Sequence, residues 1–144
     1  MENYLWLVYA LLSAVAAAMV SVFGKIGLQG LDAHTATAVR AVIMAAFLVA
    51  VAVFQRRWEH LPELWADKRA MTFILLSGVA GALSWLFYFT ALKYGKVSQV
   101  APVDKLSVVL AATAAVVFLH DTVSVISAAV MGLITAGIIL VALV

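Results

Sequence analysis

The sequence predicts an all-α integral membrane protein with five transmembrane helices, and three observations lead to this fold class. Apolar residues make up 67% of the 144 residues, against about 45–50% in a soluble domain. Only 11% of the residues are charged, whereas a soluble domain uses about 25% to cover its surface. Finally, the chain contains five separate stretches that reach the roughly 20 apolar residues needed to cross a bilayer.

The same composition argues against several other classes of protein. The chain has no cysteine, which excludes disulfides, thiolate metal sites and cysteine nucleophiles. The net charge of +2 is a small excess without a basic stripe, so we expect no nucleic-acid binding. His34, His60 and His120 are far apart in segments that we interpret as loops. None of them has a helical metal-binding partner, and no cofactor is expected.

The first predicted span covers residues 4–23, and its early Tyr4 and Trp6 suit an interfacial aromatic belt. Three alanines mimic the cleavage site of a signal peptide: Ala14, Ala16 and Ala18. However, residues 1–3 contain no basic side chain, and the apolar run exceeds the usual 7–15 residues of a signal peptide. We therefore expect a mature transmembrane helix.

The second predicted span covers residues 35–54 and contains one charge, Arg40. Residues 55–69 follow as the only long polar stretch of the chain. Within it, Pro62 suits a helix start, and four apolar residues can share one side of a short helix: Trp58, Leu61, Leu64 and Trp65. We expect a short helix or anchoring loop in the membrane interface.

The remaining predicted spans cover residues 70–92, 97–119 and 123–144. Five spans of about 20 residues leave little more than about 40 positions for loops, so no extramembrane domain is expected. Backbone groups inside hydrocarbon must be hydrogen-bonded within their own segment. No strand-like alternation of apolar and polar residues suggests a β-barrel, so all five spans are predicted to be helices in one domain, residues 1–144.

Three charged residues lie well inside predicted spans: Arg40, Asp104 and Lys105. A charge at the centre of a span costs about 2.5–3.5 kcal/mol on insertion scales. Each of the three therefore needs a partner, a wet cavity or a function. Lys25 and Lys93 stand near helix ends and can reach the interface with their long side chains.

The fourth span has the highest density of polar groups, around Pro102. Proline removes a helical hydrogen bond and clashes with the preceding turn, so we predict a kink at Pro102. Asp104 and Ser107 share one face, whereas Lys105 shares another with Pro102. These side chains are candidates for a transport pathway. The alternative is an ion pair of Asp104 with Arg40 or Lys105 that only fixes helix packing.

Two other spans carry patterns of interest. Trp85 and Tyr88 lie along a small and polar stripe of the third span, and they can line a cavity for a cationic or aromatic solute or anchor the helix at the interface. In the fifth span, three small residues recur every four positions: Ala128, Gly132 and Ala136. This ridge predicts a helix-packing seam, between subunits or within one chain.

Several motifs together resemble the short, single-repeat bacterial members of the EamA family, in the drug/metabolite transporter superfamily. They are Ser84-Trp85-Leu86-Phe87-Tyr88-Phe89, Ala91-Leu92-Lys93 and Val100-Ala101-Pro102-Val103-Asp104-Lys105-Leu106-Ser107. Phe23-Gly24-Lys25-Ile26-Gly27, Asp32, Arg40, Gly132 and Gly137 also fit, so the resemblance covers essentially the whole chain. One departure is His120-Asp121, where the family usually has Gly-Glu.

This resemblance implies a fold and an assembly. Larger relatives contain two inverted five-helix repeats around a central cavity, with access alternating between the two faces. The present chain resembles one such repeat, so the resemblance implies an antiparallel homodimer in the bacterial inner membrane. Loop charges fit dual insertion, because basic residues are nearly balanced: on one side Arg56, Arg57, Lys68 and Arg69, and on the other Lys25, Lys93 and Lys96.

The expected function is therefore that of a small secondary transporter for metabolites or drugs, coupled to protons, in contact with the lipid bilayer and a small-molecule substrate. Its expected pathway residues are Lys25, Arg40, Trp85, Tyr88, Asp104, Lys105 and Ser107. Asp104 is the expected titrating or cation-binding group, because burial and neighbouring cations shift the protonation of a carboxylate in opposite directions. The sequence leaves the charge of the substrate open.

Two other functions stay open from the sequence: a non-transporting scaffold or accessory subunit, and a lipid flippase. An enzyme is not expected, because no nucleophile is paired with a general base and the short loops offer no water-excluded site.

Overall fold

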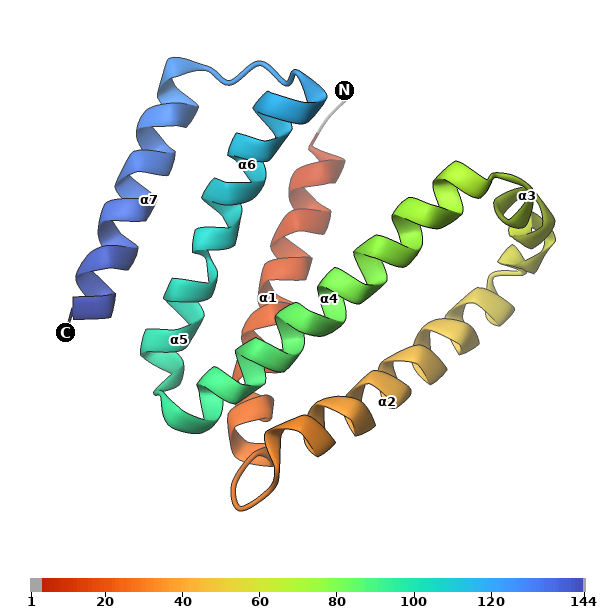
Figure 1. Ribbon diagram of the computed structural model, residues 1–144, viewed down its shortest axis with the longest axis horizontal. Coiled ribbons are helices and arrows are strands. Elements are labelled where there is room, and N and C mark those ends of the chain that lie inside the picture. The colour runs from red at the N-terminus through yellow and green to blue at the C-terminus, as the bar shows by residue number, and fades with distance from the viewer. Residues whose placement is uncertain (1–3, 144) are drawn as a thin grey trace. The chain divides into compact units, whose positions relative to one another are not determined.

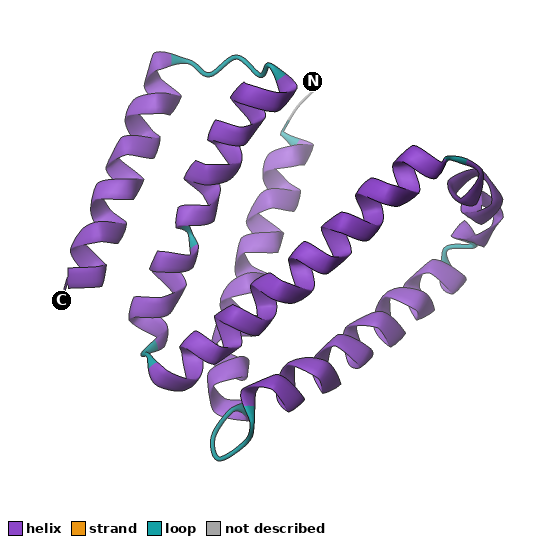
Figure 2. Ribbon diagram, viewed as in Figure 1, coloured by secondary structure: helices purple, strands orange, loops and turns teal. Residues whose placement is uncertain are grey.

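The computed structural model describes residues 4–143, apart from the side chain of His60, and its elements in this range are helices joined by short loops (Figures 1 and 2). No strand occurs among these residues. Residues 1–3, which bear on the signal-peptide argument, and residue 144 lie outside the described range. The helices in chain order are α1 (Leu5–Gly27), α2 (Ala33–Phe54), the 3₁₀ helix η1 (Arg57–His60), α3 (Leu61–Ala66), α4 (Lys68–Tyr94), α5 (Val97–Asp104), α6 (Leu106–Leu119) and α7 (Val125–Leu143).

Within the described residues, five helical segments are long and apolar enough to cross a membrane: α1, α2, α4, α5 with α6, and α7. At most 6% of the most apolar stretch of each segment is buried inside the chain. Helices that are apolar on all sides and this little covered require lipid or other helices around them. The prediction of an all-helical, multi-pass membrane protein is confirmed.

The chain divides into two compact units, one formed by residues up to 22 and from 94 onward, the other by residues 23–93. In the first unit, α7 folds back along α5 and α6 (Figure 1). Its packed face contains the buried Ile138 and the half-buried Met131 and Thr135. The predicted small-residue ridge lies on an exposed part of α7, and a Cβ atom added at Gly132 would meet nothing within 4 Å.

The second unit has its core where the end of α1, the start of α2 and the end of α4 meet. Four apolar residues are buried there: Leu28, Ala33, Phe89 and Leu92. The connection from α1 to α2 turns at Gly30, whose φ of +76° favours glycine. Asp32 then caps α2, because its carboxylate accepts hydrogen bonds from the Thr35 backbone N–H at 2.8 Å and the Thr35 hydroxyl at 3.0 Å.

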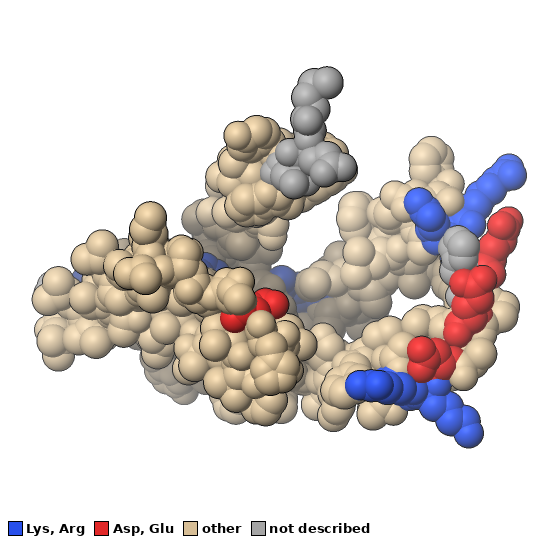
Figure 3. All heavy atoms as spheres, turned by 90° about the horizontal axis from the view of Figure 1, so that it is seen from above, with Lys and Arg blue, Asp and Glu red and all other residues tan. Residues whose placement is uncertain are grey.

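The polar segment between α2 and α4 folds into η1 and α3. Pro62 is the second residue of α3, where its missing N–H leaves no helical hydrogen bond unmade. Trp58 and Trp65 are exposed. Most charged side chains of unit 2 lie in this segment and the first turn of α4, and Figure 3 shows such side chains gathered together. Such a mixture of exposed tryptophans and charges is typical of the membrane–water interface.

Candidate functional site

Arg40 lies inside α2, and its guanidinium stacks on aromatic rings of α4. The guanidinium carbon is 3.7 Å from the centre of the Trp85 ring and 4.9 Å from that of Phe89. Electrostatic attraction to a ring face contributes about 0.5–1 kcal/mol at exposed sites and about 2 kcal/mol or more where water is excluded. The rings therefore offset part of the penalty for placing Arg40 in a membrane span.

The ring faces leave most of the binding capacity of Arg40 unused. A guanidinium has five N–H donors in a planar fork. Within residues 4–143, Arg40 forms no hydrogen bond or ion pair, and the side chain is only half-buried. Arg40 is thus a charged group in a membrane span with its hydrogen-bond donors available to a ligand.

Three aromatic residues of α4 form the wall against which Arg40 rests. Trp85, Tyr88 and Phe89 are three and four residues apart, which places them on one helix face. The Trp85 and Tyr88 rings meet edge-on, with 5.7 Å between their centres and planes at 88°. Phe89 lies 5.7 Å from Trp85 and 6.0 Å from Tyr88. Tyr88 meets both other rings edge-on, whereas the planes of Trp85 and Phe89 are tilted by 39°. These contacts favour one fixed arrangement of the rings.

Gly24 of α1 lies directly against the Phe89 ring. A Cβ atom at position 24 would lie 2.6 Å from Cε1 of Phe89 and 3.0 Å from its Cζ. Phe89 is only 3% exposed, so its ring has little space to move away. The absence of a side chain at Gly24 therefore lets α1 approach the aromatic wall.

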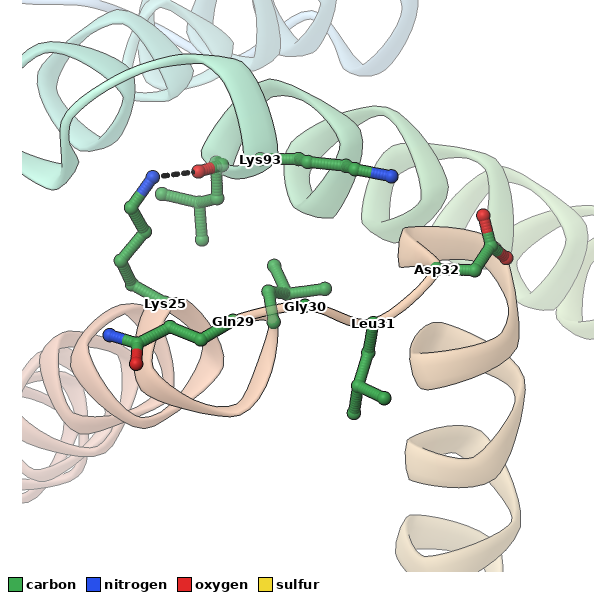
Figure 4. Close-up of a pocket in the computed structure, with 8 residues that line it drawn as sticks. Lys25, Gln29, Gly30, Leu31, Asp32 and Lys93 are labelled. Atoms are coloured by element: carbon green, nitrogen blue, oxygen red, sulfur yellow. Dashed lines mark hydrogen bonds between the residues drawn. The ribbon is translucent and has the colours of Figure 1, made fainter.

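A pocket of about 480 Å³ opens at the loop end of the same unit (Figure 4). Its lining residues are Lys25, Leu28, Gln29, Gly30, Leu31, Asp32, Leu92 and Lys93. The Lys25 ammonium donates a hydrogen bond to the Leu92 carbonyl, one of the last carbonyls of α4, which have no partner within the helix. A cation at this position also interacts favourably with the helix dipole.

Lys93 and Asp32 lie on the other side of the pocket, with the Lys93 side chain directed toward the start of α2 (Figure 4). Hydrogen bonds from the backbone and side chain of Thr35 lower the pKa of Asp32, and the charges of His34 and Lys93 lower it further. Asp32 therefore stays anionic at neutral pH. The pocket brings two ammonium groups together with one carboxylate that already serves as the cap of α2.

In the first unit, the predicted kink region is a break in the helix at Lys105, three residues after Pro102. The backbone N–H of Lys105 bonds to the Pro102 carbonyl, and that of Val108 bonds to the Lys105 carbonyl, both at 3.0 Å. These three-residue steps replace the four-residue steps of an α-helix. The helix therefore divides into α5 and α6, whereas the sequence predicted one kinked helix over residues 97–119.

At this break Asp104 and Lys105 form an ion pair with 3.2 Å between Oδ2 and Nζ. Their side chains are 33% and 56% exposed, so water screens the pair unless another surface covers it. Ser107 is exposed on the first turn of α6. A second opening of about 450 Å³ lies nearby between α5 and α7, and Lys96, Ser98 and Gln99 contribute its polar groups.

The structure thus groups the candidate residues into clusters. Arg40, Trp85 and Tyr88 belong to one aromatic cluster, and Asp104 pairs with Lys105. Phe89 was not among the candidates, although its spacing from Trp85 placed it on the same face. The pocket residues Gln29, Asp32 and Lys93 were also not among the expected pathway residues. The loop charges had placed Lys25 and Lys93 on the same side of the membrane, and this was the one signal in the sequence that pointed to the pocket.

Two comparisons with known proteins found a match, one to a transporter family and one to a protein described as a transporter. The sequence profile of the EamA-like transporter family matches residues 4–143. A Sinorhizobium sp. protein described as an "Uncharacterized transporter in cobO 3'region" is 37% identical over 137 residues, which cover 95% of this chain and 96% of the relative. No solved structure matches the chain.

Proposed function

The chain belongs to the EamA-like transporter family, and from this premise we propose that it is a secondary transporter for small molecules, coupled to protons, which works as a homodimer. Its general character, a multi-pass membrane transporter, follows from family membership and the five membrane-crossing segments among residues 4–143. The substrate type, the coupling and the assembly are the proposal. The bacterial relative supports a location in the bacterial inner membrane.

The observation that carries this proposal is the environment of Arg40. A charge that only fixed helix packing would have its donors engaged by a carboxylate or by carbonyls. Arg40 instead rests on two aromatic rings and forms no hydrogen bond within the described residues. A charged residue in a membrane span that remains available to a ligand favours a solute pathway over a scaffold.

Proton coupling is proposed for the Asp104–Lys105 pair. Protonation of Asp104 removes the charge that holds the Lys105 ammonium at 3.2 Å, and the freed ammonium then needs another partner. The pair lies at the break between α5 and α6, so this change acts where three-residue hydrogen bonds replace those of an α-helix. Protonation would thereby favour one of two cavity states.

Transport into liposomes tests this coupling. Purified protein is reconstituted and uptake is measured for phenyl compounds bearing an anionic, a cationic or a zwitterionic group, at several pH values. We expect uptake of at least one class, with a pH dependence that Asp104→Asn abolishes while the folded protein persists. Unchanged pH dependence in Asp104→Asn would contradict coupling through Asp104, and a variant that misassembles would favour a role of the pair in packing.

For the assembly, we propose an antiparallel homodimer in which Lys25, Arg40, Trp85, Tyr88, Asp104, Lys105 and Ser107 of each copy face a shared pathway. Support comes from the five spans found among residues 4–143, an odd number, and from the exposed ridge on α7. Because the chain contains no cysteine, Lys68→Cys gives a unique label site on the polar segment. Labelling of this site from both sides of the membrane is expected, and labelling from one side alone would contradict dual topology.

A further inference from the structure

The charges of the membrane-embedded residues are not balanced, and this imbalance bears on the substrate. Asp104 is compensated by its neighbour Lys105. Arg40 has no carboxylate partner within residues 4–143. Of the three charges well inside the spans, Arg40, Asp104 and Lys105, the one left without a compensating charge is therefore positive.

The pocket at the loop end adds positive charge along the same elements. Lys25 and Lys93 bring two ammonium groups, whereas its single carboxylate, Asp32, is engaged by Thr35. Arg40 follows Asp32 by eight residues along α2, and Trp85 precedes Lys93 by eight residues along α4. At a rise of about 1.5 Å per residue, Arg40 therefore lies about 12 Å along α2 from Asp32, and Trp85 lies about 12 Å along α4 from Lys93.

The surroundings of these cations are apolar or aromatic. Leu28, Leu31 and Leu92 line the pocket. Arg40 lies over the rings of Trp85 and Phe89, which in turn contact the Tyr88 ring. A carboxylate or phosphate group can accept paired N–H···O bonds from a planar guanidinium. The apolar or flat part of such a molecule can pack on the ring faces.

Building on the proposed transport function, we propose that the substrate is an organic anion, with a carboxylate or phosphate group on an apolar body, whose acidic group binds the guanidinium of Arg40. The pocket with Lys25 and Lys93 attracts the anion by its positive field. At Arg40 the acidic group accepts hydrogen bonds from the guanidinium fork. The Trp85 ring, freed in part from the cation, then contacts the body of the solute.

Binding can be measured apart from transport through the fluorescence of Trp85. A variant carrying Trp6→Phe, Trp58→Phe and Trp65→Phe leaves Trp85 as the single tryptophan, since the chain has four. The full chain is purified in phosphatidylcholine nanodiscs and titrated at constant ionic strength. The probes share a phenyl group: hippurate as the carboxylate, phenyl phosphate as the phosphate and benzyltrimethylammonium as the cation.

We expect saturable emission changes with hippurate or phenyl phosphate and none with the cation. Arg40→Gln should weaken the anion response roughly tenfold or more, since loss of one charge-assisted interaction has at least this effect, and Arg40→Lys should retain part of it. Arg57→Gln removes the same charge from the exposed polar segment and should leave binding unchanged. The comparison of probe charges uses no Arg40 variant, so it holds even where Arg40→Gln fails to fold.

Three results would overturn this proposal. They are a response to the cation alone, no response to any probe, and an anion response that Arg40→Gln leaves unchanged in a folded protein. A fourth concerns lipid: if phosphatidylglycerol nanodiscs shift the emission and abolish the probe response, Arg40 binds a lipid phosphate and not a solute. Anion binding without uptake would contradict the transport function alone, whereas uptake of the cation alone would contradict this substrate class alone.

Discussion

Gly24 is predicted to be essential for packing α1 against the aromatic wall of α4. In Gly24→Ala the new methyl group would lie 2.6 Å from Cε1 and 3.0 Å from Cζ of Phe89, far inside ordinary contact. The Phe89 ring is 3% exposed and packs on Trp85, so it cannot rotate away freely. Forcing an extra methyl group into such a site costs about 1–3 kcal/mol, and we expect this loss in the free energy of unfolding in mixed micelles.

Gly27→Ala in the same helix is the matched control. A Cβ atom at Gly27 would meet nothing within 4 Å, so this variant should be neutral or more stable by up to about 1 kcal/mol through the higher helix propensity of alanine. Phe89→Leu should relieve part of the clash, giving a favourable coupling energy with Gly24→Ala in a double-mutant cycle. Equal stability of Gly24→Ala and Gly27→Ala would refute the contact between Gly24 and Phe89.

Substitutions at three further positions test other parts of the structure. Asp32→Ala should destabilise α2 by removing its cap, whereas Asp32→Asn should keep the cap. Because hydrogen bonds from Thr35 lower the pKa of Asp32 below its ordinary value of 3.8, its ionic contribution is complete above that value and is lost as the pH falls further; acid titration of stability should show this in wild type and not in Asp32→Asn. Lys25→Met removes the charged donor from the Leu92 carbonyl and should lower the free energy of unfolding by about 1.5–3 kcal/mol, with Lys25→Arg nearer to wild type, and equal stability of the methionine variant would contradict this role. Gly132→Ile should leave the chain folded, because its position is open, but should shift the particle from dimer to monomer in light scattering, and an unchanged dimer would place the subunit contact elsewhere.

The spans were predictable from the sequence because a bilayer imposes one length and one composition on each of them. Their ends were less predictable. The first helix was expected to end at residue 23 and continues to Gly27, where the Lys25 side chain binds the end of α4. That contact joins residues 67 positions apart, and no local pattern shows it.

The sequence showed which residues belong to the candidate site better than it showed which of them contact one another. Arg40 was conspicuous as a charge in an apolar span. Trp85 and Tyr88 were conspicuous as aromatic residues with polar groups in the third span. Helical spacing shows which residues share a face of one helix, but it does not show which helix that face meets. From the sequence, Trp85 could line a cavity for a solute or anchor its helix at the interface, whereas the structure places the Arg40 guanidinium on its ring.

The break at Lys105 was also only partly predictable from the sequence. Pro102 predicted a disturbance of the helix, because it lacks a backbone donor. In the structure the break lies three residues beyond Pro102, where three-residue hydrogen bonds form at Lys105. Asp104 and Lys105 form their ion pair at this break.

We propose that this chain moves a solute that binds at Arg40. Uptake of radiolabelled hippurate and phenyl phosphate into liposomes tests this most directly. Wild type, Arg40→Gln and Arg57→Gln are reconstituted at equal protein density, with protein-free liposomes as the baseline. We predict saturable uptake of at least one probe above baseline by wild type and Arg57→Gln, and baseline uptake by Arg40→Gln. Baseline uptake of both probes by wild type, or equal uptake by wild type and Arg40→Gln, would contradict the claim.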